Sequence, residues 1–245
     1  MQLTLDIGNT RTKASFFDDR TLIKSNVISY DNEEKWINYF HSYPVKHVIY
    51  SASGEINASL QAALKLLEVP IMQLSSTISL PFVNKYRTPE TLGMDRIANM
   101  CAAHLLYPKQ STLVIDVGTC ATYDFLENGR VYLGGMISPG LEMRLKAMNS
   151  FTERLPMVNK KKVPLIGTDT ESCMQSGALH GLAAEIDGVI NGYRMRFQSM
   201  NVILTGGDTN ALQSIIKNHI FARPYLQAEG LNNALLYNLA SLENH

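Results

Sequence analysis

Asp6-Ile7-Gly8-Asn9-Thr10 is the stretch that decides the fold of this chain of 245 residues. It follows the apolar run Leu3-Thr4-Leu5 and precedes a second strand-like run, Lys13 to Phe17. This order predicts a β-hairpin whose turn begins at Gly8. Gly8 has no Cβ, so a ligand can approach the backbone, and successive N–H groups in such a turn form an anion-binding concavity. Taken alone, the pentapeptide also fits a plain tight turn in which the Asp carboxylate caps backbone amides.

A second copy of this pattern opens the other half of the chain. Asp116-Val117-Gly118-Thr119-Cys120 follows the apolar run Leu113-Val114-Ile115 and leads into another strand-like run, Ala121 to Phe125. A third glycine turn, Thr205-Gly206-Gly207-Asp208, follows the apolar run Val202-Ile203-Leu204. Two Asp-x-Gly hairpins in two halves, followed by a Gly-Gly turn, resemble the layout of the actin-like ATPase and sugar-kinase fold.

This resemblance implies an α/β protein built from two duplicated actin-like, or ribonuclease H-like, halves with a nucleotide cleft between them. The expected halves are residues 1–110 and 111–245. In that fold the two hairpins hold the nucleotide phosphates from opposite sides, and the later Gly-Gly turn lies against the adenosine. A carboxylate such as Asp6 suits a phosphate site if a cation or a bound water lies between the two.

Composition and charge narrow the class of protein. The hydrophobic fraction of 45% is ordinary for a folded soluble chain. Lys plus Arg and Asp plus Glu number 22 each, so the net charge gives no support for nucleic-acid or membrane binding. Three widely spaced cysteines favour reduced thiols in a cytoplasmic protein over a disulfide framework. The sequence shows no secretory signal segment, and no apolar run approaches the roughly 20 residues that span a bilayer.

Between the two hairpins, strand and helix patterns alternate, which favours α/β layering. Helices are expected at residues 33–41 and 57–67, and strands at residues 27–30, 47–51 and 70–74. Residues 82–91 break the alternation and are expected to form a loop. Gly93-Met94-Asp95-Arg96 then opens a helix that ends near residue 107, with its apolar stripe at Met94, Ile97, Ala98, Cys101 and Leu105. Asp95 could simply favour the positive end of the helix dipole, but Arg96 gains nothing there, so the pair calls for another partner.

The second half continues the sheet at residues 131–133 and then enters a glycine-rich turn, Gly134 to Gly140, that leads into a helix at residues 141–149. This turn suits either an anion or a tight strand-to-helix connection. Lys160-Lys161-Lys162 predicts a mobile, solvated loop. Residues 168–197 are expected to form one long helix or two joined helices. Gly177, Gly181, Ala184, Gly188 and Gly192 recur along one side, which indicates close approach of another backbone, in this chain or in a second subunit. Helices at residues 209–217 and 229–242 close the chain.

From Leu3 to about Leu236 the chain resembles the type III pantothenate kinases, which phosphorylate pantothenate at the start of coenzyme A biosynthesis. The Asp-x-Gly hairpins alone indicate only the superfamily. The family resemblance rests on Gly93-Met94-Asp95-Arg96 followed by Gly134-Gly135-x-Ile137-x-Pro139-Gly140, with Thr168-Asp169-Thr170 and Thr205-Gly206-Gly207 in support.

The resemblance implies a role for each matching residue. It implies an ATP phosphate-binding segment at Asp6, Ile7, Gly8, Asn9, Thr10, Arg11, Thr12 and Lys13, with a further ATP contact at Thr119. It implies pantothenate-binding positions at Tyr86, Gly93, Met94, Asp95, Arg96 and Thr170, with Asp95 as the catalytic base. Asp116 matches the ligand of a monovalent cation, K⁺ or NH₄⁺. Members of the family use Mg²⁺ with ATP and are homodimers that bind pantothenate near the subunit interface.

Two other functions remain open at the level of sequence. One is a different enzyme of the same fold, such as a sugar kinase or a phosphatase that acts on polyphosphate, and the Gly-x-Asp-Arg motif argues against it. The other is a nucleotide-binding regulator without catalysis, and the complete set of Asp6, Asp95, Arg96 and Asp116 argues against that. The chemistry of phosphoryl transfer suits the same residues: Asp95 to take the hydroxyl proton, Arg96 to pair with a substrate carboxylate, and Asp116 to hold a cation.

Overall fold

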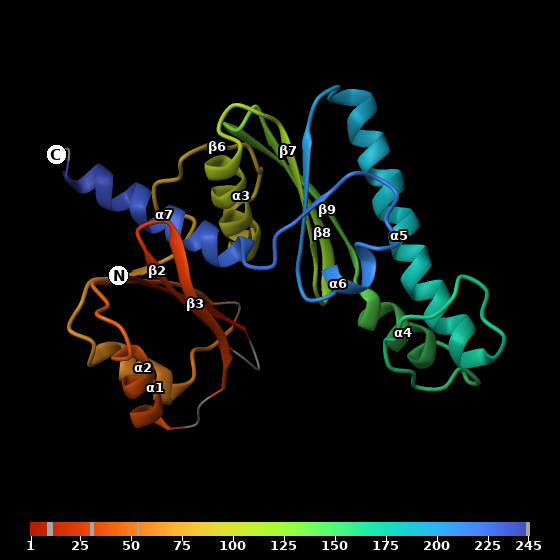
Figure 1. Cartoon of the computed structure of the whole chain (residues 1–245), viewed down its shortest axis with the longest axis horizontal. Coiled ribbons are helices and arrows are strands. Elements are labelled where there is room, and N and C mark those ends of the chain that lie inside the picture. The colour runs from red at the N-terminus through yellow and green to blue at the C-terminus, as the bar shows by residue number, and fades with distance from the viewer. Residues whose placement is uncertain (9–11, 30–31, 53, 244–245) are drawn as a thin grey trace. The chain divides into compact units, whose positions relative to one another are not determined.

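The computed structural model describes residues 1–8, 12–29, 32–52 and 54–243, and it divides into two compact units (Figure 1). Unit 1 comprises Met1–Pro108 and Tyr225–His245, and unit 2 comprises Lys109–Pro224. The expected halves, residues 1–110 and 111–245, therefore differ from the observed units at the C-terminus. The difference arises because helix α7 (Leu226–Glu243) packs against helix α3 (Met94–Leu106) of unit 1.

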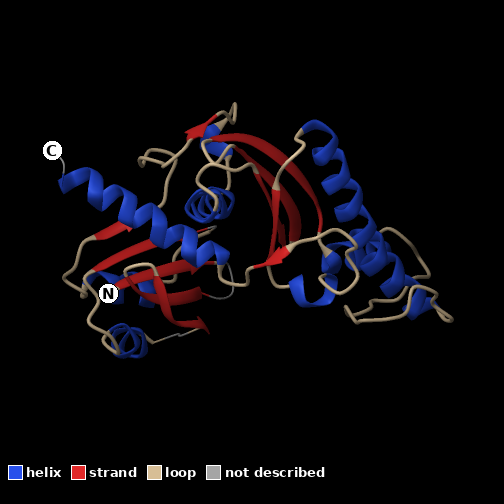
Figure 2. Ribbon diagram, turned by 45° about the horizontal axis from the view of Figure 1, so that its top comes forward, coloured by secondary structure: helices blue, strands red, loops and turns tan. Residues whose placement is uncertain are grey.

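Unit 1 is built on a five-stranded sheet with helices on both faces (Figure 2). The sheet order is β3-β2-β1-β4-β5, and its strands are β1 (Gln2–Ile7), β2 (Thr12–Asp18), β3 (Thr21–Ile28), β4 (His47–Ala52) and β5 (Ile71–Gln73). Helices α1 (Glu33–Phe40) and α2 (Ala58–Lys65) cover one face, and α7 packs on β1 and β4 at the other. The short strand β6 (Val83–Asn84) and a 3₁₀ helix, Pro89–Thr91, precede α3.

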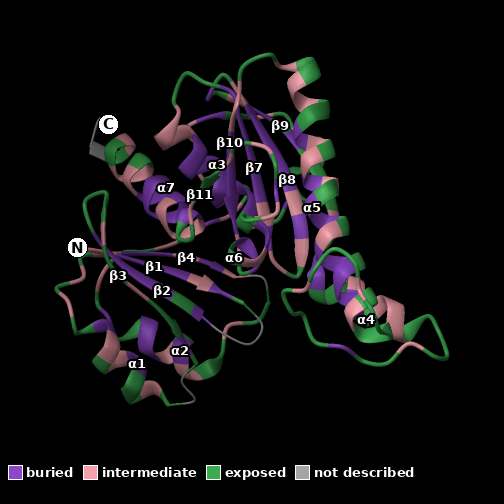
Figure 3. Ribbon diagram, turned by 45° about the vertical axis from the view of Figure 1, so that its right-hand side comes forward, coloured by how far each residue is buried: buried purple, intermediate pink, exposed green. Residues whose placement is uncertain are grey.

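Unit 2 repeats this architecture. Its strands run in the order β11-β10-β7-β8-β9, with β7 (Thr112–Val117), β8 (Cys120–Glu127), β9 (Val131–Pro139), β10 (Asn201–Thr205) and β11 (Phe221–Ala222). Helices α4 (Leu141–Ser150), α5 (Thr170–Arg196) and α6 (Thr209–Leu212) complete the unit. The long helix α5 buries one side against the sheet and exposes the other (Figure 3).

The same strand pairing in both units confirms the duplication that the two hairpins predicted. In unit 1 the β1–β2 pair is antiparallel and β4 runs parallel to β1. In unit 2 the β7–β8 pair is antiparallel and β10 runs parallel to β7. Each hairpin is extended on one side by a third antiparallel strand and on the other by a second parallel strand.

Side-chain alternation along the first strand of each unit positions its aspartate. In β1, Leu3, Leu5 and Ile7 point into the core formed with α1 and α2, so the side chains of Thr4 and Asp6 point to the opposite face, where α7 packs. In β7, Leu113, Ile115 and Val117 point into the core formed with α5, which turns Asp116 to the other face. The period of two thus places both carboxylates away from the main apolar core of their unit.

Several boundaries differ from the sequence prediction. The first predicted strand after the hairpin begins earlier, at Thr21. Strand β9 runs through the glycine-rich stretch to Pro139, because Gly134, with φ +97°, accommodates a register shift opposite Phe125 and Leu126. Helix α6 is much shorter than the helix expected at residues 209–217. The cap of α1 is Asn32, whose Oδ1 accepts hydrogen bonds from Glu34 N and Lys35 N in the first turn.

Other sequence expectations concern the cysteines and the membrane. Cys101, Cys120 and Cys173 are all free thiols. Burial raises the pKa of Cys101 to about 12, so this thiol stays protonated in the core of α3. Across the described part of the chain, no helix combines the length and apolar character needed to cross a bilayer.

Glycine at the α3–α7 contact gives a test of how closely the two helices pack. A Cβ built on Gly230 of α7 lies 1.8 Å from the carbonyl oxygen of Ala98 in α3. We expect Gly230→Ala to lower the free energy of unfolding by about 1–3 kcal/mol, because a methyl group must separate the helices. Urea unfolding followed by circular dichroism measures this.

Gly207→Ala is the matched control for that measurement. A Cβ built on Gly207 meets nothing within 4 Å, so its stability should change by less than about 0.5 kcal/mol. Equal stability of the two variants would contradict the close packing of α7 on α3.

Candidate active site

The first cluster lies at the end of β1 in unit 1. Asp6 and Lys13 are register partners in the β1–β2 pair, and Lys13 Nζ lies 3.7 Å from Asp6 Oδ2. Gly8 is exposed, whereas the side chains of Ile7 and Thr12 are buried, so these two residues can offer a ligand only backbone groups. Of the predicted ATP phosphate-binding segment, Asn9, Thr10 and Arg11 lie outside the described residues.

The electrostatics of Asp6 connect this hairpin with α3 and α7. Burial is the largest influence and raises the pKa of the Asp6 carboxyl above its ordinary value, and the negative charge of Asp95 raises it further. The Lys13 charge and a hydrogen bond with Gln227 of α7 oppose this rise. Two carboxylates and one ammonium group therefore share one region of unit 1, where a cation would relieve the repulsion between Asp6 and Asp95.

Asp95 and Arg96 occupy the first turn of α3 in different ways. Asp95 is exposed, and its Oδ1 accepts a hydrogen bond from Arg96 N at 2.9 Å. Gly93, which caps the helix, leaves room for this carboxylate, because a Cβ there would lie 2.4 Å from Asp95 Oδ1. The structure thus gives a physical reason for glycine two residues before the aspartate in the Gly-Met-Asp-Arg motif.

Arg96 is buried, with 5% of its surface exposed, and its guanidinium lies over the ring of Tyr86 at 5.4 Å from the centroid. The structure therefore brings together Tyr86 and Arg96, two of the predicted substrate-binding residues. Tyr86 is held in turn by a hydrogen bond from its backbone N to Asn84 Oδ1 at 2.9 Å. A cation stacked on an aromatic ring is pre-oriented to pair with a carboxylate.

The apolar stripe predicted for α3 was too narrow. Ile97, Ala98 and Cys101 are buried as expected, whereas Met94 and Leu105 are only half-buried. Asn99, Met100, Ala102 and Ala103 are buried as well. Contacts on several sides of the helix explain this, since α3 packs on α7 and on β4. The first turn therefore belongs to a helix that is largely buried, which favours a well-defined position for Asp95.

The second cluster lies at the β7–β8 turn in unit 2. Gly206, with φ +97°, packs on Asp116 and Val117, since a Cβ there would lie 2.5 Å from Asp116 Oδ1 and 2.6 Å from Val117 N. The backbone N of Asp208 donates to Val117 O at 3.0 Å. The predicted Gly-Gly turn is therefore joined directly to the second Asp-x-Gly hairpin.

Gly140 closes this cluster from the start of α4. Its N–H donates to Thr119 O at 3.1 Å, and a Cβ there would lie 2.2 Å from Gly118 O. Of the two sequence interpretations of the glycine-rich stretch, this contact favours the tight connection. Thr119 itself is exposed, and Thr170 is an exposed residue at the first position of α5.

Two sets of interactions were missed by the sequence prediction. Lys160 and Lys162 are exposed, as expected of a solvated loop. The sequence did not predict that Lys160 Nζ lies 2.5 Å from Asp208 Oδ1 or that Lys162 Nζ donates to Ser214 Oγ at 3.0 Å. Arg144 of α4 pairs with Glu185 of α5. None of these three pairs has a local sequence signal, because the partners are 48, 52 and 41 residues apart in the chain.

The donor sets bear on which ions these clusters can hold. Among the described residues, no group of three or more His, Cys, Asp or Glu side chains is arranged to bind a metal ion. Asp116 offers one partly buried carboxylate beside a backbone-lined turn. Such an oxygen set suits a weakly bound hard cation that is also held by a ligand.

Comparison with known proteins places this architecture. A family model described as type III pantothenate kinase matches residues 2–192. The type III pantothenate kinase of Christiangramia forsetii is 42% identical over 97% of this chain and 99% of its own. That of Bacteroides fragilis is 41% identical over 97% of this chain and 98% of its own.

Solved structures bear on the fold. A Baf family protein from Campylobacter jejuni has a TM-score of 0.60 at 22% identity and covers 97% of this chain and 99% of its own. A ROK hexokinase from Thermus thermophilus has a TM-score of 0.50 at 15% identity and covers 98% of this chain and 99% of its own. The fold is thus the actin-like ATPase and sugar-kinase fold. Because the family model spans most of the chain and the relatives align over nearly all of it, the chain belongs to the type III pantothenate kinase family.

Proposed function

We propose that the protein transfers the γ-phosphoryl group of ATP to the hydroxyl of pantothenate, the first step of coenzyme A biosynthesis. The observation that carries this proposal is the first turn of α3, where an exposed Asp95 adjoins a buried Arg96 that stacks on Tyr86. An alcohol with a carboxylate elsewhere in the molecule needs one group of each kind: a proton acceptor for the hydroxyl and a cation for the carboxylate. Pantothenate is such a substrate.

Asp95 is the proposed proton acceptor. One carboxylate oxygen holds the Arg96 N–H, which fixes the side chain, and the other is available to the substrate hydroxyl. Phosphoryl transfer passes through a loose transition state, so orientation of the hydroxyl matters alongside its deprotonation. The position of Asp95 at the start of a buried helix serves this orientation.

ATP is proposed to bind through the Asp6–Lys13 segment and Thr119. Exposed backbone at Gly8 and the ammonium group of Lys13 suit phosphate oxygens. Mg²⁺, when bound with ATP, neutralises charge that develops on the phosphoryl oxygens. Asp6 is the carboxylate that would face this cation, and relief of its repulsion with Asp95 favours that assignment.

We further propose that Asp116 binds a monovalent cation, K⁺ or NH₄⁺. A carboxylate beside ATP phosphates opposes binding unless its charge is compensated. The backbone around Asp116 is tightly packed by Gly206, so the carboxylate has little freedom to move away. We also propose that the enzyme acts in the cytoplasm, in line with its reduced thiols.

A homodimer is proposed for the assembly, with the glycine-lined side of α5 at its interface. Cβ atoms built on Gly177, Gly181, Gly188 and Gly192 meet nothing within 4 Å, so the close approach that they indicated does not occur among the described residues. A cavity of about 590 Å³ adjoins this side and is lined by apolar and aromatic residues that include Met136 and Tyr193. A second copy would cover both, and Thr170 at the start of α5 would then complete a shared site.

The first prediction from the proposed function tests the reaction. Asp95→Asn keeps the size of the side chain and an oxygen for the Arg96 N–H, but it removes the proton acceptor. We expect kcat for ATP and pantothenate to fall by about 10²–10⁴, with little change in ATP affinity or melting temperature. If Asp95 served only the helix dipole, the variant would lose roughly 0.3–1 kcal/mol of stability and keep its kcat.

Wild-type turnover against a panel of alcohols, sugars included, separates pantothenate kinase from other kinases of this fold and from a regulator without activity.

The second prediction concerns the monovalent cation. Activity of the wild type should rise with added K⁺, and Asp116→Asn should weaken both that response and the use of ATP. Initial rates over a K⁺ series, with the ionic strength held constant by a bulky organic cation, measure it. Unchanged activation by K⁺ in the variant would contradict the proposed role of Asp116.

The third prediction concerns assembly. Multi-angle light scattering should give twice the mass of one chain, and Gly188→Trp should reduce that mass because an indole would keep the two copies apart. Glu34→Trp, on the exposed side of α1, is the control for a new surface tryptophan and should stay dimeric. A monomeric wild type at working concentration would remove the proposal.

A further inference from the structure

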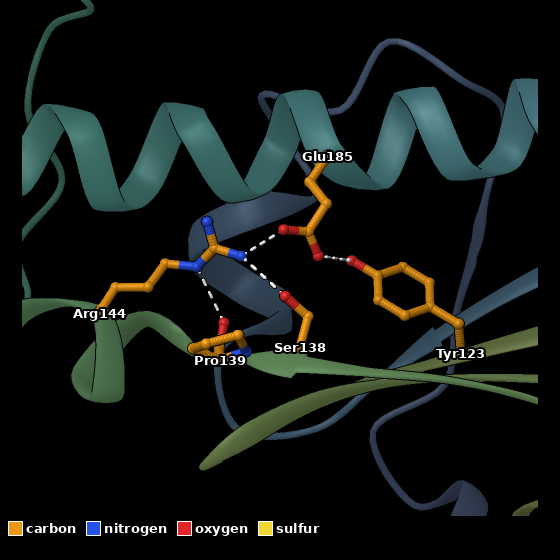
Figure 4. Close-up of polar contacts among 5 residues, drawn as sticks. All are labelled: Tyr123, Ser138, Pro139, Arg144 and Glu185. Atoms are coloured by element: carbon orange, nitrogen blue, oxygen red, sulfur yellow. Dashed lines mark hydrogen bonds and ion pairs between the residues drawn. The ribbon is translucent and has the colours of Figure 1, made fainter. Parts of the chain in front are cut away.

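The polar network around Arg144 joins four elements of unit 2 (Figure 4). Arg144 lies on α4, Glu185 on α5, Tyr123 on β8, and Ser138 with Pro139 at the end of β9. Arg144 pairs with Glu185 Oε2, and its Nη2 also donates to Ser138 Oγ at 3.1 Å. Its Nε donates to Pro139 O at 2.9 Å.

Glu185 is the centre of this network. Its other oxygen, Oε1, accepts a hydrogen bond from the hydroxyl of Tyr123 at 2.7 Å. Partial burial alone would raise the pKa of Glu185, but the hydrogen bonds from Tyr123 and Arg144 outweigh it and hold the pKa below its ordinary value. Burial and the Glu185 hydrogen bond raise the pKa of Tyr123. At neutral pH, Glu185 is therefore ionised and the Tyr123 hydroxyl keeps its proton.

The network reaches the β7–β8 turn through Pro139, which is the register partner of Cys120, the first residue of β8 after the turn. Pro139 has no N–H, so its carbonyl is its only backbone hydrogen-bonding group, and Arg144 takes it. The next residue, Gly140, donates to Thr119 O at 3.1 Å and accepts from Arg144 N at 3.0 Å. Gly140 also packs so closely that a Cβ there would lie 2.6 Å from Thr119 O. Movement of Ser138, Pro139 and Gly140 is therefore transmitted to Thr119.

We propose that Arg144 and Glu185 are positioning residues, which hold Gly140 against the Gly118–Thr119 turn and so set the place of Thr119 toward ATP. The inference rests on the proposed function, since it takes Thr119 as an ATP contact. The guanidinium is already occupied by Pro139, Ser138 and Glu185, so Arg144 acts on the nucleotide through the turn and not by direct contact. The expected consequence is a selective effect on ATP.

The test compares two Glu→Gln variants. In each, the glutamate that is replaced pairs with a basic residue of α4. Glu185→Gln removes the charge that holds Arg144 and Tyr123. Glu142→Gln removes the exposed Glu142–Lys146 pair, at 2.7 Å on the same helix, and is the matched control. Each variant is characterised by the KM for ATP, the KM for pantothenate, kcat and the melting temperature.

We expect Glu185→Gln to raise the KM for ATP by about tenfold, the effect of one hydrogen bond to a charged group, and to leave the KM for pantothenate within twofold. Glu142→Gln should leave all four quantities near wild type. Arg144→Lys, which keeps the charge but loses the Nε donor to Pro139 O, should fall between wild type and Arg144→Met in its KM for ATP.

Different outcomes separate this inference from the proposed function. A wild type that does not turn over ATP and pantothenate would remove the proposed function itself. An active wild type with a Glu185→Gln variant of unchanged KM for ATP would overturn only the positioning role. A Glu185→Gln variant with a lower melting temperature, and with both KM values unchanged or raised equally, would also overturn the positioning role, because that pattern indicates a role in stability alone.

Discussion

Close approach of one backbone to another, which only glycine permits, is the constraint on which the second unit depends. At Gly206 the chain passes within van der Waals contact of Asp116 and Val117, and at Gly140 it passes over Gly118 and Thr119. Any side chain at either position would separate the three segments. The clustering of the β7–β8 turn, the Gly-Gly turn and the start of α4 is therefore a consequence of missing Cβ atoms, and side-chain attraction plays a secondary part.

The same device appears in unit 1 with a different result. Gly230 lets α7 pack on the backbone of Ala98 in α3, and a hydrogen bond from Asn233 Nδ2 to Cys101 O, at 2.8 Å, fixes the contact one turn further along. This contact holds the C-terminal helix in unit 1. It also supports α3, whose first turn carries Asp95 and Arg96. The positions of the proposed proton acceptor and of the arginine proposed to bind the substrate carboxylate therefore depend on a helix more than a hundred residues away in sequence.

Charge balance distinguishes the two clusters. In unit 1, the Asp6 carboxylate is attracted by the Lys13 ammonium group and repelled by Asp95. Its burial raises its pKa. In unit 2, Asp208 beside the Gly-Gly turn is paired with Lys160, whereas Asp116 has glycine backbone packed against its carboxylate. In the proposed function each cluster contributes one carboxylate to a cation site, which agrees with a phosphoryl-transfer chemistry that relies on positioning and electrostatics more than on covalent steps.

The sequence by itself determined the local and repeated features of this protein. Strand alternation and the two Asp-x-Gly hairpins depend on neighbours in the chain, so the sequence predicted them. The Gly-Met-Asp-Arg motif, with the later glycine-rich stretch, indicated the family and made Asp95 the candidate base. Only the tertiary structure decided that Arg96 is buried on Tyr86, that Lys160 is tied to Asp208, that Arg144 joins Glu185 and that α7 belongs to unit 1. The physical reason is that these contacts join segments that lie from ten to more than a hundred residues apart, and no periodicity or local propensity encodes which partner outside its own element a charged side chain or a glycine will meet.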